Sequence, residues 1–466
     1  MLVPSIPVSS RRAQAAERNV RLDPQGIYGT RSARRQNQLR RRRQLQNLFL
    51  WLIGLVAAGF LIWWGLQPRQ TLRGASWTRQ LPFRPASPPL LAPLLAGRET
   101  GADSSRASLF FTSQSGGLWR WSHSSPETRP RRADSFWKEP TRVFSTGFAP
   151  AATPLVSGKQ VFWPGGDGVL RAIDSGSGVQ KWRGVFGSAL ACTPAVAKVA
   201  GREIVAAGDD SGVVAAFDAK SGAPKWKTNL GGAVGAAMAV FEGVSATKNE
   251  ASADFLVPTL AGTTSRGGLV CLDGKSGRVK WRFPGDARSQ SAGGAAPLVQ
   301  KNRVFWGNDE GAVVCLDART GQKIWKNYAA PAKTPGEKKP GRYRDEQGSA
   351  ATSLRGGAAL SEAAGTVVFG GNDGFLHAFD LATGAARWRQ NLGAAARFPA
   401  QATIFENRAM FLAAGDAPAI FLLEARTGRV ERRWTTPFPV SSGMTEAGGN
   451  IYALDAGGLL QVAALK

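Results

Sequence analysis

The 466-residue chain contains little of what redox, metal and nucleophilic sites are built from, since it has three cysteines and two histidines. His123 and His377 lie far apart in the sequence, which argues against a histidine metal site or a Ser-His-Asp triad. Cys192, Cys271 and Cys315 are an odd set, and the last two occupy equivalent Val-Cys-Leu-Asp segments. We expect all three to be small buried hydrophobic residues rather than disulfide partners.

Glycine is abundant at 56 residues, yet no Gly-x-x-x-x-Gly-Lys-Ser/Thr nucleotide-binding motif occurs. Segments such as Gly165-Gly166-Asp167-Gly168 are typical of hairpin turns, and a single acidic turn is too common to indicate Ca²⁺. The sequence therefore predicts no catalytic residue, no cofactor and no metal ligand.

Acidic residues are scarce: 33 against 59 Lys and Arg, which gives a net charge of +26. Residues 1–47 contribute +9 of this, from eleven arginines against Glu17 and Asp23, and the rest of the chain contributes +17. Such an excess attracts anionic lipid head groups, acidic cell-wall polymers or an acidic protein face. The alternative is that the charge reflects general solubility and the composition of the host proteome. Nucleic acid is not expected as a partner if the folded part lies outside the cytoplasm.

One long hydrophobic run occurs, over residues 48–66, and it carries no charge. Its length suffices to cross a hydrocarbon core of ~30 Å as a helix, and the arginines before it, including Arg40 to Arg43, favour a cytoplasmic N-terminus. A cleaved signal peptide is the rival interpretation, but the run exceeds the usual ~7–15 residues and no convincing small-x-small site follows. We expect a single-pass protein of the inner membrane with its C-terminal part in the periplasm or otherwise extracytoplasmic.

The most informative pattern is a repeat, in which an acidic residue is followed four positions later by glycine. It occurs six times, at Asp174/Gly178, Asp218/Gly222, Asp273/Gly277, Asp317/Gly321, Asp380/Gly384 and Glu424/Gly428. In the first five copies a tryptophan follows after four more positions, at Trp182, Trp226, Trp281, Trp325 and Trp388. A unit recurring at this interval is one supersecondary module that buries its apolar face only against its neighbours.

Each copy predicts a β-hairpin, a turn at the acidic residue and a third strand that carries the tryptophan. We interpret the acidic residues as turn formers, because a carboxylate there can accept backbone N–H bonds. The indole at one fixed place per module predicts a wedge between adjacent sheets, which buries on the order of 200 Å².

These motifs closely resemble the tryptophan-docking repeat of the PQQ-like β-propeller family, which includes quinoprotein dehydrogenases and the BamB-like outer-membrane assembly factor type. The resemblance covers roughly Trp77 to the C-terminus and implies an all-β propeller. It implies no particular activity, because many functions share such a scaffold. The quinoprotein dehydrogenases have vicinal cysteines that stack on the quinone, and this chain has none. The lipid anchor of the BamB pattern is also missing, since no cysteine precedes Cys192.

Hairpin signals number eight, which predicts an eight-bladed propeller, with seven blades as the alternative if the first hairpin is an embellishment. They lie near Leu109–Trp121, Val161–Ile173, Ile204–Phe217, Phe255–Leu272, Val304–Leu316, Val367–Phe379, Met410–Leu423 and Ile451–Val462. No tryptophan strand follows the last hairpin, whereas Ser76-Trp77-Thr78-Arg79 precedes the first. We therefore expect Trp77 to complete the last blade and close the ring, which removes two exposed sheet edges. Trp137 or Phe144 are candidates for the docking residue of the first blade, and Trp434 comes two positions late in the seventh.

The predicted organisation is a disordered basic cytoplasmic tail (1–47), a transmembrane helix (48–66), a linker (67–75) and the propeller (76–466). The insertion Ala329–Ser353 contains a cluster of basic and aromatic residues among prolines and glycines, and we expect it to be an exposed loop that contacts a partner. The candidate contacts are Lys338, Lys339, Arg342, Tyr343 and Arg344.

These features together predict a non-enzymatic protein-binding scaffold, monomeric, with an envelope protein as partner and a role in envelope or outer-membrane protein assembly suggested by the BamB resemblance. The Arg-rich tail is a candidate for contact with anionic lipid. The alternative is a membrane-tethered PQQ-dependent quinoprotein or small-ligand sensor that uses the central channel.

Overall fold

The computed structural model describes most of residues 75–465. The described ranges are 75–81, 106–113, 115–124, 141–148, 150–244, 251–260, 267–284, 295–309, 311–329, 353–393, 395, 400–415, 418–436, 439–440, 444–447, 450–454 and 459–465. The chain divides into residues 1–69 and 70–466, and all described residues belong to the second unit. The predicted tail, transmembrane helix and linker up to residue 74 lie outside the described residues. Within the described ranges, no helix is long and apolar enough to span a membrane.

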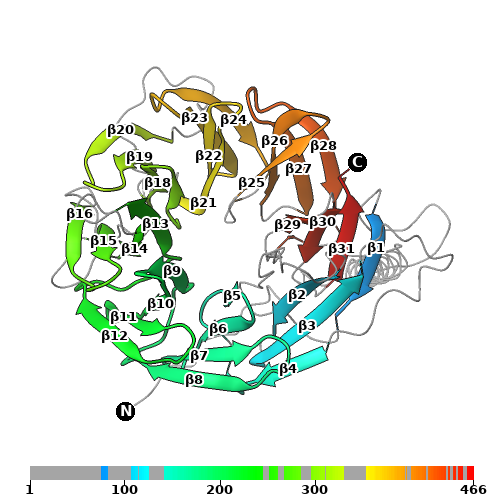
Figure 1. The fold of residues 1–466 in the computed structure, drawn as a ribbon. Coiled ribbons are helices and arrows are strands. Elements are labelled where there is room, and N and C mark those ends of the chain that lie inside the picture. The colour runs from blue at the N-terminus through cyan, green and yellow to red at the C-terminus, as the bar shows by residue number, and fades with distance from the viewer. Residues whose placement is uncertain are drawn as a thin grey trace, which may run out of the picture. The chain divides into compact units, whose positions relative to one another are not determined.

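All elements of the described ranges are β-strands, which confirms the all-β prediction. They form eight antiparallel sheets, seven with four strands and one with three, and within residues 70–466 these sheets follow one another around a ring (Figure 1). Each of the eight expected hairpins is present. Counted from the centre of the ring, a hairpin forms the second and third strands of each four-stranded sheet and the two inner strands of the three-stranded sheet, which we also call second and third. The second strands are β2 (Arg106–Thr112), β6 (Gln160–Pro164), β10 (Arg202–Gly208), β14 (Ala251–Thr259), β18 (Arg303–Gly307), β22 (Thr366–Gly371), β26 (Arg408–Ala414) and β30 (Asn450–Leu454). The third strands are β3 (Gly117–Ser124), β7 (Val169–Asp174), β11 (Val213–Asp218), β15 (Gly268–Asp273), β19 (Ala312–Asp317), β23 (Phe375–Asp380), β27 (Ala419–Glu424) and β31 (Leu459–Ala464).

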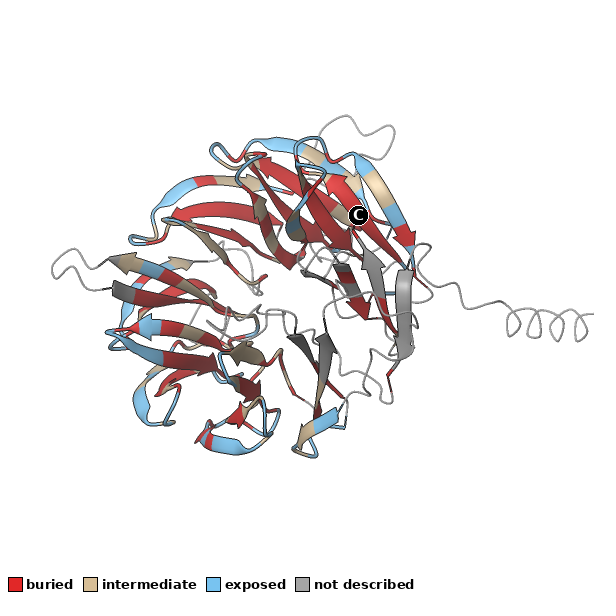
Figure 2. Cartoon of the chain, turned by 45° about the vertical axis from the view of Figure 1, so that its right-hand side comes forward, coloured by how far each residue is buried: buried red, intermediate tan, exposed pale blue. Residues whose placement is uncertain are grey.

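The outermost strand of each sheet lies at the rim of the ring (Figure 1). These strands are β4 (Thr141–Ser145), β8 (Gln180–Val185), β12 (Pro224–Asn229), β16 (Val279–Pro284), β20 (Lys323–Tyr328), β24 (Ala386–Asn391), β28 (Val430–Thr435) and β1 (Ala75–Gln80). The five docking tryptophans are on β8, β12, β16, β20 and β24. β8, β12 and β24 alternate exposed residues with more buried ones, so each of them has one face toward solvent (Figure 2).

A fourth, innermost strand in seven of the sheets was not expected from the sequence. These strands are β5 (Leu155–Ser157), β9 (Ala195–Val199), β13 (Ala239–Val244), β17 (Leu298–Gln300), β21 (Leu354–Ser361), β25 (Gln401–Phe405) and β29 (Met444–Ala447). Two of them are only three residues long. They form because the inner edge of each hairpin offers unpaired backbone groups that a neighbouring segment can satisfy.

The last sheet combines the two ends of the unit, in the order β1-β31-β30-β29. The register of β1 and β31 is antiparallel and places Trp77 opposite Val462. The side chains of β1 are outside the described set. The strand pairing itself is the one expected from the position of Trp77, and it covers the outer edge of β31.

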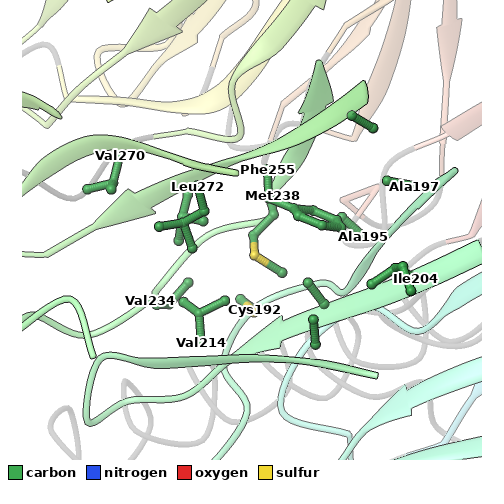
Figure 3. Packing of buried hydrophobic residues seen from close by; sticks show 14 of the residues in the cluster. Cys192, Ala195, Ala197, Ile204, Val214, Val234, Met238, Phe255, Val270 and Leu272 are labelled. Carbon is green, nitrogen blue, oxygen red and sulfur yellow. The ribbon is translucent and has the colours of Figure 1, made fainter. Parts of the chain in front are cut away.

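The hydrophobic core is distributed between the sheets rather than gathered at one centre. One cluster joins the sheet β9–β12 to the sheet β13–β16, and Figure 3 shows Met238 and Phe255 facing Cys192 and Val214 across this junction. Clusters join six further pairs of neighbouring sheets in the same way, and the middle strands are almost continuously buried (Figure 2). Stability therefore depends on contacts between neighbouring sheets, as in other repeat proteins.

Candidate functional site

The acidic residues at the ends of the third strands cap the turns that follow them. Asp218 Oδ1 accepts the backbone N–H of Ser221 at 2.9 Å and its hydroxyl at 2.8 Å, while the Gly222 N–H bonds the Asp218 carbonyl at 2.8 Å. The turns at Asp174, Asp273, Asp317 and Asp380 repeat this arrangement with Ser or Thr. At Glu424 the longer side chain keeps only the hydroxyl bond, from Thr427 at 2.6 Å. These residues are turn formers, as the sequence predicted.

Hydrogen bonds to the turn carboxylates favour their ionised form. At Asp218 the bonds from Ser221 hold the pKa below its ordinary value, and at Asp380 the bonds from Thr383 and Arg387 lower the pKa to about 2. Asp273 and Asp317 have lowered pKa values too, although burial acts in the opposite direction as the largest contribution in each. The turn aspartates are thus ionised at neutral pH and already used by their own turns.

Each of the five tryptophans lies at a junction and donates its indole N–H to a carbonyl of the next sheet. The acceptor is always the residue directly after the acidic turn residue. The pairs are Trp182 with Ala219 (2.9 Å), Trp226 with Gly274 (2.8 Å), Trp281 with Ala318 (3.0 Å), Trp325 with Leu381 (3.4 Å) and Trp388 with Ala425 (3.2 Å). Each repeat therefore takes part in two junctions, since its turn accepts the indole of the preceding sheet and its outermost strand supplies an indole to the next.

In five of the six turns the glycine is the surface on which the indole of the preceding sheet lies, and Gly178 in the first turn instead faces the Val143 backbone. A Cβ added at Gly222 would come within 2.5 Å of the Trp182 ring, and one added at Gly321 within 2.6 Å of Trp281. Both glycines also have positive φ, at +75° and +71°. Glycine is required here for its backbone conformation and for the space that the indole occupies.

The residue across the ladder from each tryptophan is small, which explains two of the cysteines. Trp182, Trp226 and Trp388 pair with Ala172, Ala216 and Ala378, whereas Trp281 and Trp325 pair with Cys271 and Cys315. All three cysteines are free and buried, as expected. Burial raises the thiol pKa of Cys192 and of Cys315 to about 12 each, so both are neutral at physiological pH.

Arginines replace the indole at two junctions where the tryptophan motif is missing. Arg432 Nη1 donates to the Leu465 carbonyl at 3.3 Å, and its guanidinium lies 4.5 Å from the centre of the Phe405 ring. Arg120 Nη1 donates to the carbonyls of Ser175 at 2.9 Å and Gly176 at 2.8 Å. Ser175 and Leu465 both follow the end of a third strand, so these arginines reach the same acceptor position as the tryptophans do.

One of these arginines could have been found in the sequence. Arg432 follows Glu424 by eight positions, which is the spacing between acid and tryptophan in the other repeats. Leu422, its cross-strand neighbour, is correspondingly larger than the Ala or Cys opposite a tryptophan. Trp434, which the sequence suggested as a late docking residue, is buried with Val440 and Met444 in the cluster that joins its sheet to the next. Arg120 lies at no such offset, and only the structure reveals it.

The sequence-predicted partner contacts Lys338, Lys339, Arg342, Tyr343 and Arg344 lie outside the described residues. The ends of their insertion are described, and both are anchored. The Ala329 N–H bonds the Gly311 carbonyl at 2.8 Å, and the Ser353 hydroxyl bonds Asp309 Oδ1 at 2.7 Å.

No group of His, Cys, Asp and Glu residues suited to hold a metal ion occurs in the part of the chain that the structure describes. His377 is buried, and its Nε2 lies 2.9 Å from Asp373 Oδ2 in the turn of the same hairpin. The imidazole is therefore engaged within its own hairpin.

The family of the chain follows from this repeat. The family model described as outer membrane protein assembly factor BamB matches residues 135–249 and 255–465. The chain belongs to this BamB-like family of PQQ-like repeat propellers. The matched ranges of the BamB-like family include all six acidic turns and the five docking tryptophans.

Solved structures of similar fold have low sequence identity to this chain. The BamB structure from Moraxella catarrhalis is 16% identical, covers 67% of this chain and 96% of its own, with a TM-score of 0.45. Sqt1 from Saccharomyces cerevisiae is 11% identical, and the match covers 85% of this chain and 98% of Sqt1, with a TM-score of 0.57. The quinohemoprotein alcohol dehydrogenase from Comamonas testosteroni is 13% identical, and the match covers 84% of this chain and 76% of the dehydrogenase, with a TM-score of 0.55. The last two likenesses show the fold alone, and a comparison with curated protein sequences gave no match.

Proposed function

We propose that this protein is a membrane-anchored scaffold whose propeller lies outside the cytoplasm and binds a protein of the cell envelope, with outer-membrane protein assembly as the setting. The BamB-like family assignment supports the setting. The uncharged run of residues 48–66 and the arginines before it support the anchor and its orientation. Eight sheets, with β1 in the last one, support an eight-bladed ring.

The observation that carries the scaffold function is that the ionisable and polar groups named above have structural roles. The turn carboxylates cap turns, the indole N–H groups and two arginines close junctions, and the cysteine thiols are buried in the core. These bonds hold the connecting loops in fixed positions. A partner that binds pre-organised loops loses little conformational entropy in ordering them.

The insertion between Ala329 and Ser353 is our proposed partner contact. A deletion variant tests this proposal. Because Ala329 and Ser353 are both anchored in the ring, the variant lacks only residues 332–350 and carries a short Gly-Ser linker in their place. We expect this variant to keep its unfolding midpoint and to lose envelope proteins in affinity capture from native membranes. A capture identical to that of the unaltered protein would remove the insertion from the proposal.

A matched charge control separates the loop from net charge. The variant K338Q/K339Q/R342Q/R344Q removes four positive charges from the insertion, and K220Q/K275Q/R319Q/R426Q removes four from exposed positions in the turns. The proposal expects partner loss in the first variant only. Equal loss in both would show that capture depends on overall charge.

The second candidate function is that of a PQQ-dependent quinoprotein or small-ligand sensor, and the fold shared with a quinohemoprotein alcohol dehydrogenase motivates it. Incubation of the purified protein with PQQ and Ca²⁺ tests it. A bound quinone spectrum together with dye-linked alcohol oxidation would favour this function over the scaffold.

A further inference from the structure

The outermost strands are strongly basic. The six strands β8, β12, β16, β20, β24 and β28 together contain twelve Lys or Arg residues and a single acidic residue, Glu431. The charge is therefore concentrated on the rim of the ring, where these strands lie (Figure 1).

One basic residue occupies the same position on each of these six strands. It is the residue nine positions after the acidic turn residue, and in five of the strands it directly follows the docking tryptophan. We call this set the basic belt: Arg183, Lys227, Arg282, Lys326, Arg389 and Arg433. The ladder registers confirm the equivalence, because each belt residue pairs with the residue three positions before the acidic turn residue.

Strand alternation places the belt on the face of each outermost strand that is opposite to the docking indole. The indole of Trp182 faces the next sheet, so Arg183 beside it has its side chain on the opposite face of the strand. Five of the six belt residues are exposed and Lys326 is half-buried. Arg389 and Arg433 lie over the rings of Phe375 and Phe421, at 5.3 and 5.4 Å from their centres, so each guanidinium group lies against the third strand of its own sheet.

The belt differs from the other basic residues of the same strands in its partners. Four of the five docking tryptophans are preceded by a basic residue that is paired with an aspartate: Lys225 with Asp218 at 3.9 Å, for example, and Arg387 with Asp380 at 2.6 Å. Within the described ranges, Arg183, Lys227, Arg282 and Arg433 form no ion pair. The basic residues before the tryptophans are thus neutralised by aspartates, whereas these four belt residues remain available to a ligand.

The shape of the belt selects the ligand. Cations on successive sheets around a convex rim can all be reached by a flexible linear polyanion, whereas a flat bilayer or a rigid protein face meets only the strands on one side. Non-specific binding of single-stranded nucleic acid also relies on exposed aromatic rings for base stacking. The five rim tryptophans are docked against the next sheet, and among the residues whose side chains the structure describes, the exposed aromatic residues are Phe148 and Tyr328.

We propose that the basic belt binds an acidic polysaccharide, a linear chain of sugar units that carry carboxylate or phosphate groups. The polymer follows the rim and pairs its anionic groups with belt residues of successive sheets. This inference goes beyond the protein-binding scaffold and does not depend on the identity of the envelope partner.

The test measures binding of a fluorescently labelled polyuronate, alginate of about 25 units, to the full-length protein at low and moderate salt. The belt variant is R183Q/K227Q/R282Q/R433Q. The matched control, K220Q/K275Q/R319Q/R426Q, removes the same charge from equally exposed turn positions. All variants carry R40S/R41S/R42S/R43S as well, so that the basic tail does not mask the rim.

We expect the belt variant to bind on the order of thirtyfold more weakly, since several exposed ion pairs are lost together, and the control to change less than threefold. Equal weakening in both variants would overturn the proposal, because net charge alone would then explain binding. It would also be overturned if anionic vesicles or an oligo-dT strand displaced the polyuronate at lower charge concentration than unlabelled alginate does. Unchanged circular dichroism and unfolding midpoints establish that both variants fold.

Discussion

The glycine beneath a docking indole gives the sharpest test of how the sheets are held together. Gly321 has φ +71° and an added Cβ would lie 2.6 Å from Trp281, which belongs to the preceding sheet. We expect Gly321→Ala to cost about 1–2 kcal/mol for the left-handed backbone and a further 1–3 kcal/mol for the overlap with the ring. Gly201→Ala is the matched control, because Gly201 has φ +77° with nothing within 4 Å of the added Cβ.

The assay is equilibrium unfolding in denaturant, monitored by circular dichroism. The unfolding free energies of the variants are compared with one common value for their dependence on denaturant concentration. A double-mutant cycle separates the two contributions. Trp281→Ala should itself cost about 3–5 kcal/mol. In that background Gly321→Ala should cost only the backbone part, because no ring remains for the methyl group to meet. Gly321→Ala and Gly201→Ala of equal cost, or a cycle with no coupling, would refute the docking geometry.

Three further predictions concern the junctions, the turns and the thiols. Arg432→Ala should lower the unfolding free energy by about 1–3 kcal/mol in the same denaturant assay, because the Leu465 carbonyl loses a charged donor, and Arg432→Lys should restore little of this since Lys lacks the planar fork. The pKa of Asp380 is about 2 in the folded protein against an ordinary value of 3.8, so ionised Asp380 stabilises the fold above pH 4 and this stabilisation is lost as the pH falls from about 4 to about 2. Asp380→Asn should therefore flatten this part of a plot of unfolding free energy against pH, and an unchanged slope would contradict the prediction. All three cysteines are buried, and the thiol pKa of Cys192 is about 12, so iodoacetamide at pH 8 should modify none of them in the native protein and all three in urea. Mass spectrometry measures the labelling, and labelling of Cys192 in the native protein would be inconsistent with the core described.

The hairpins and the docking positions could be predicted because they repeat. The spacing of acid, glycine and tryptophan is set by a turn of constant length and a constant step along the outermost strand. Both are local properties of the chain, so they appear in the sequence as constant spacings between these residues. The closing strand at Trp77 was predictable for a related reason, since the last hairpin has no outermost strand of its own.

The innermost strands and the arginine junctions were not predicted. Segments such as Leu155–Ser157 are too short to show alternation, and they become strands because the edge of a hairpin is available beside them. Arg432 and Arg120 are ordinary basic residues in the sequence. Their roles appear only where the structure brings them next to a carbonyl of another sheet.

The sequence by itself determined the repeated module, because turn chemistry and strand alternation act over a few residues. Which groups of one module meet those of the next was decided by the tertiary structure. The indole of Trp281 and the Ala318 carbonyl, for example, are 37 residues apart and meet only when two sheets pack. The same packing turns the tryptophans inward and leaves Arg183 and its counterparts at the rim, so the surface available to a ligand is a consequence of how the sheets dock.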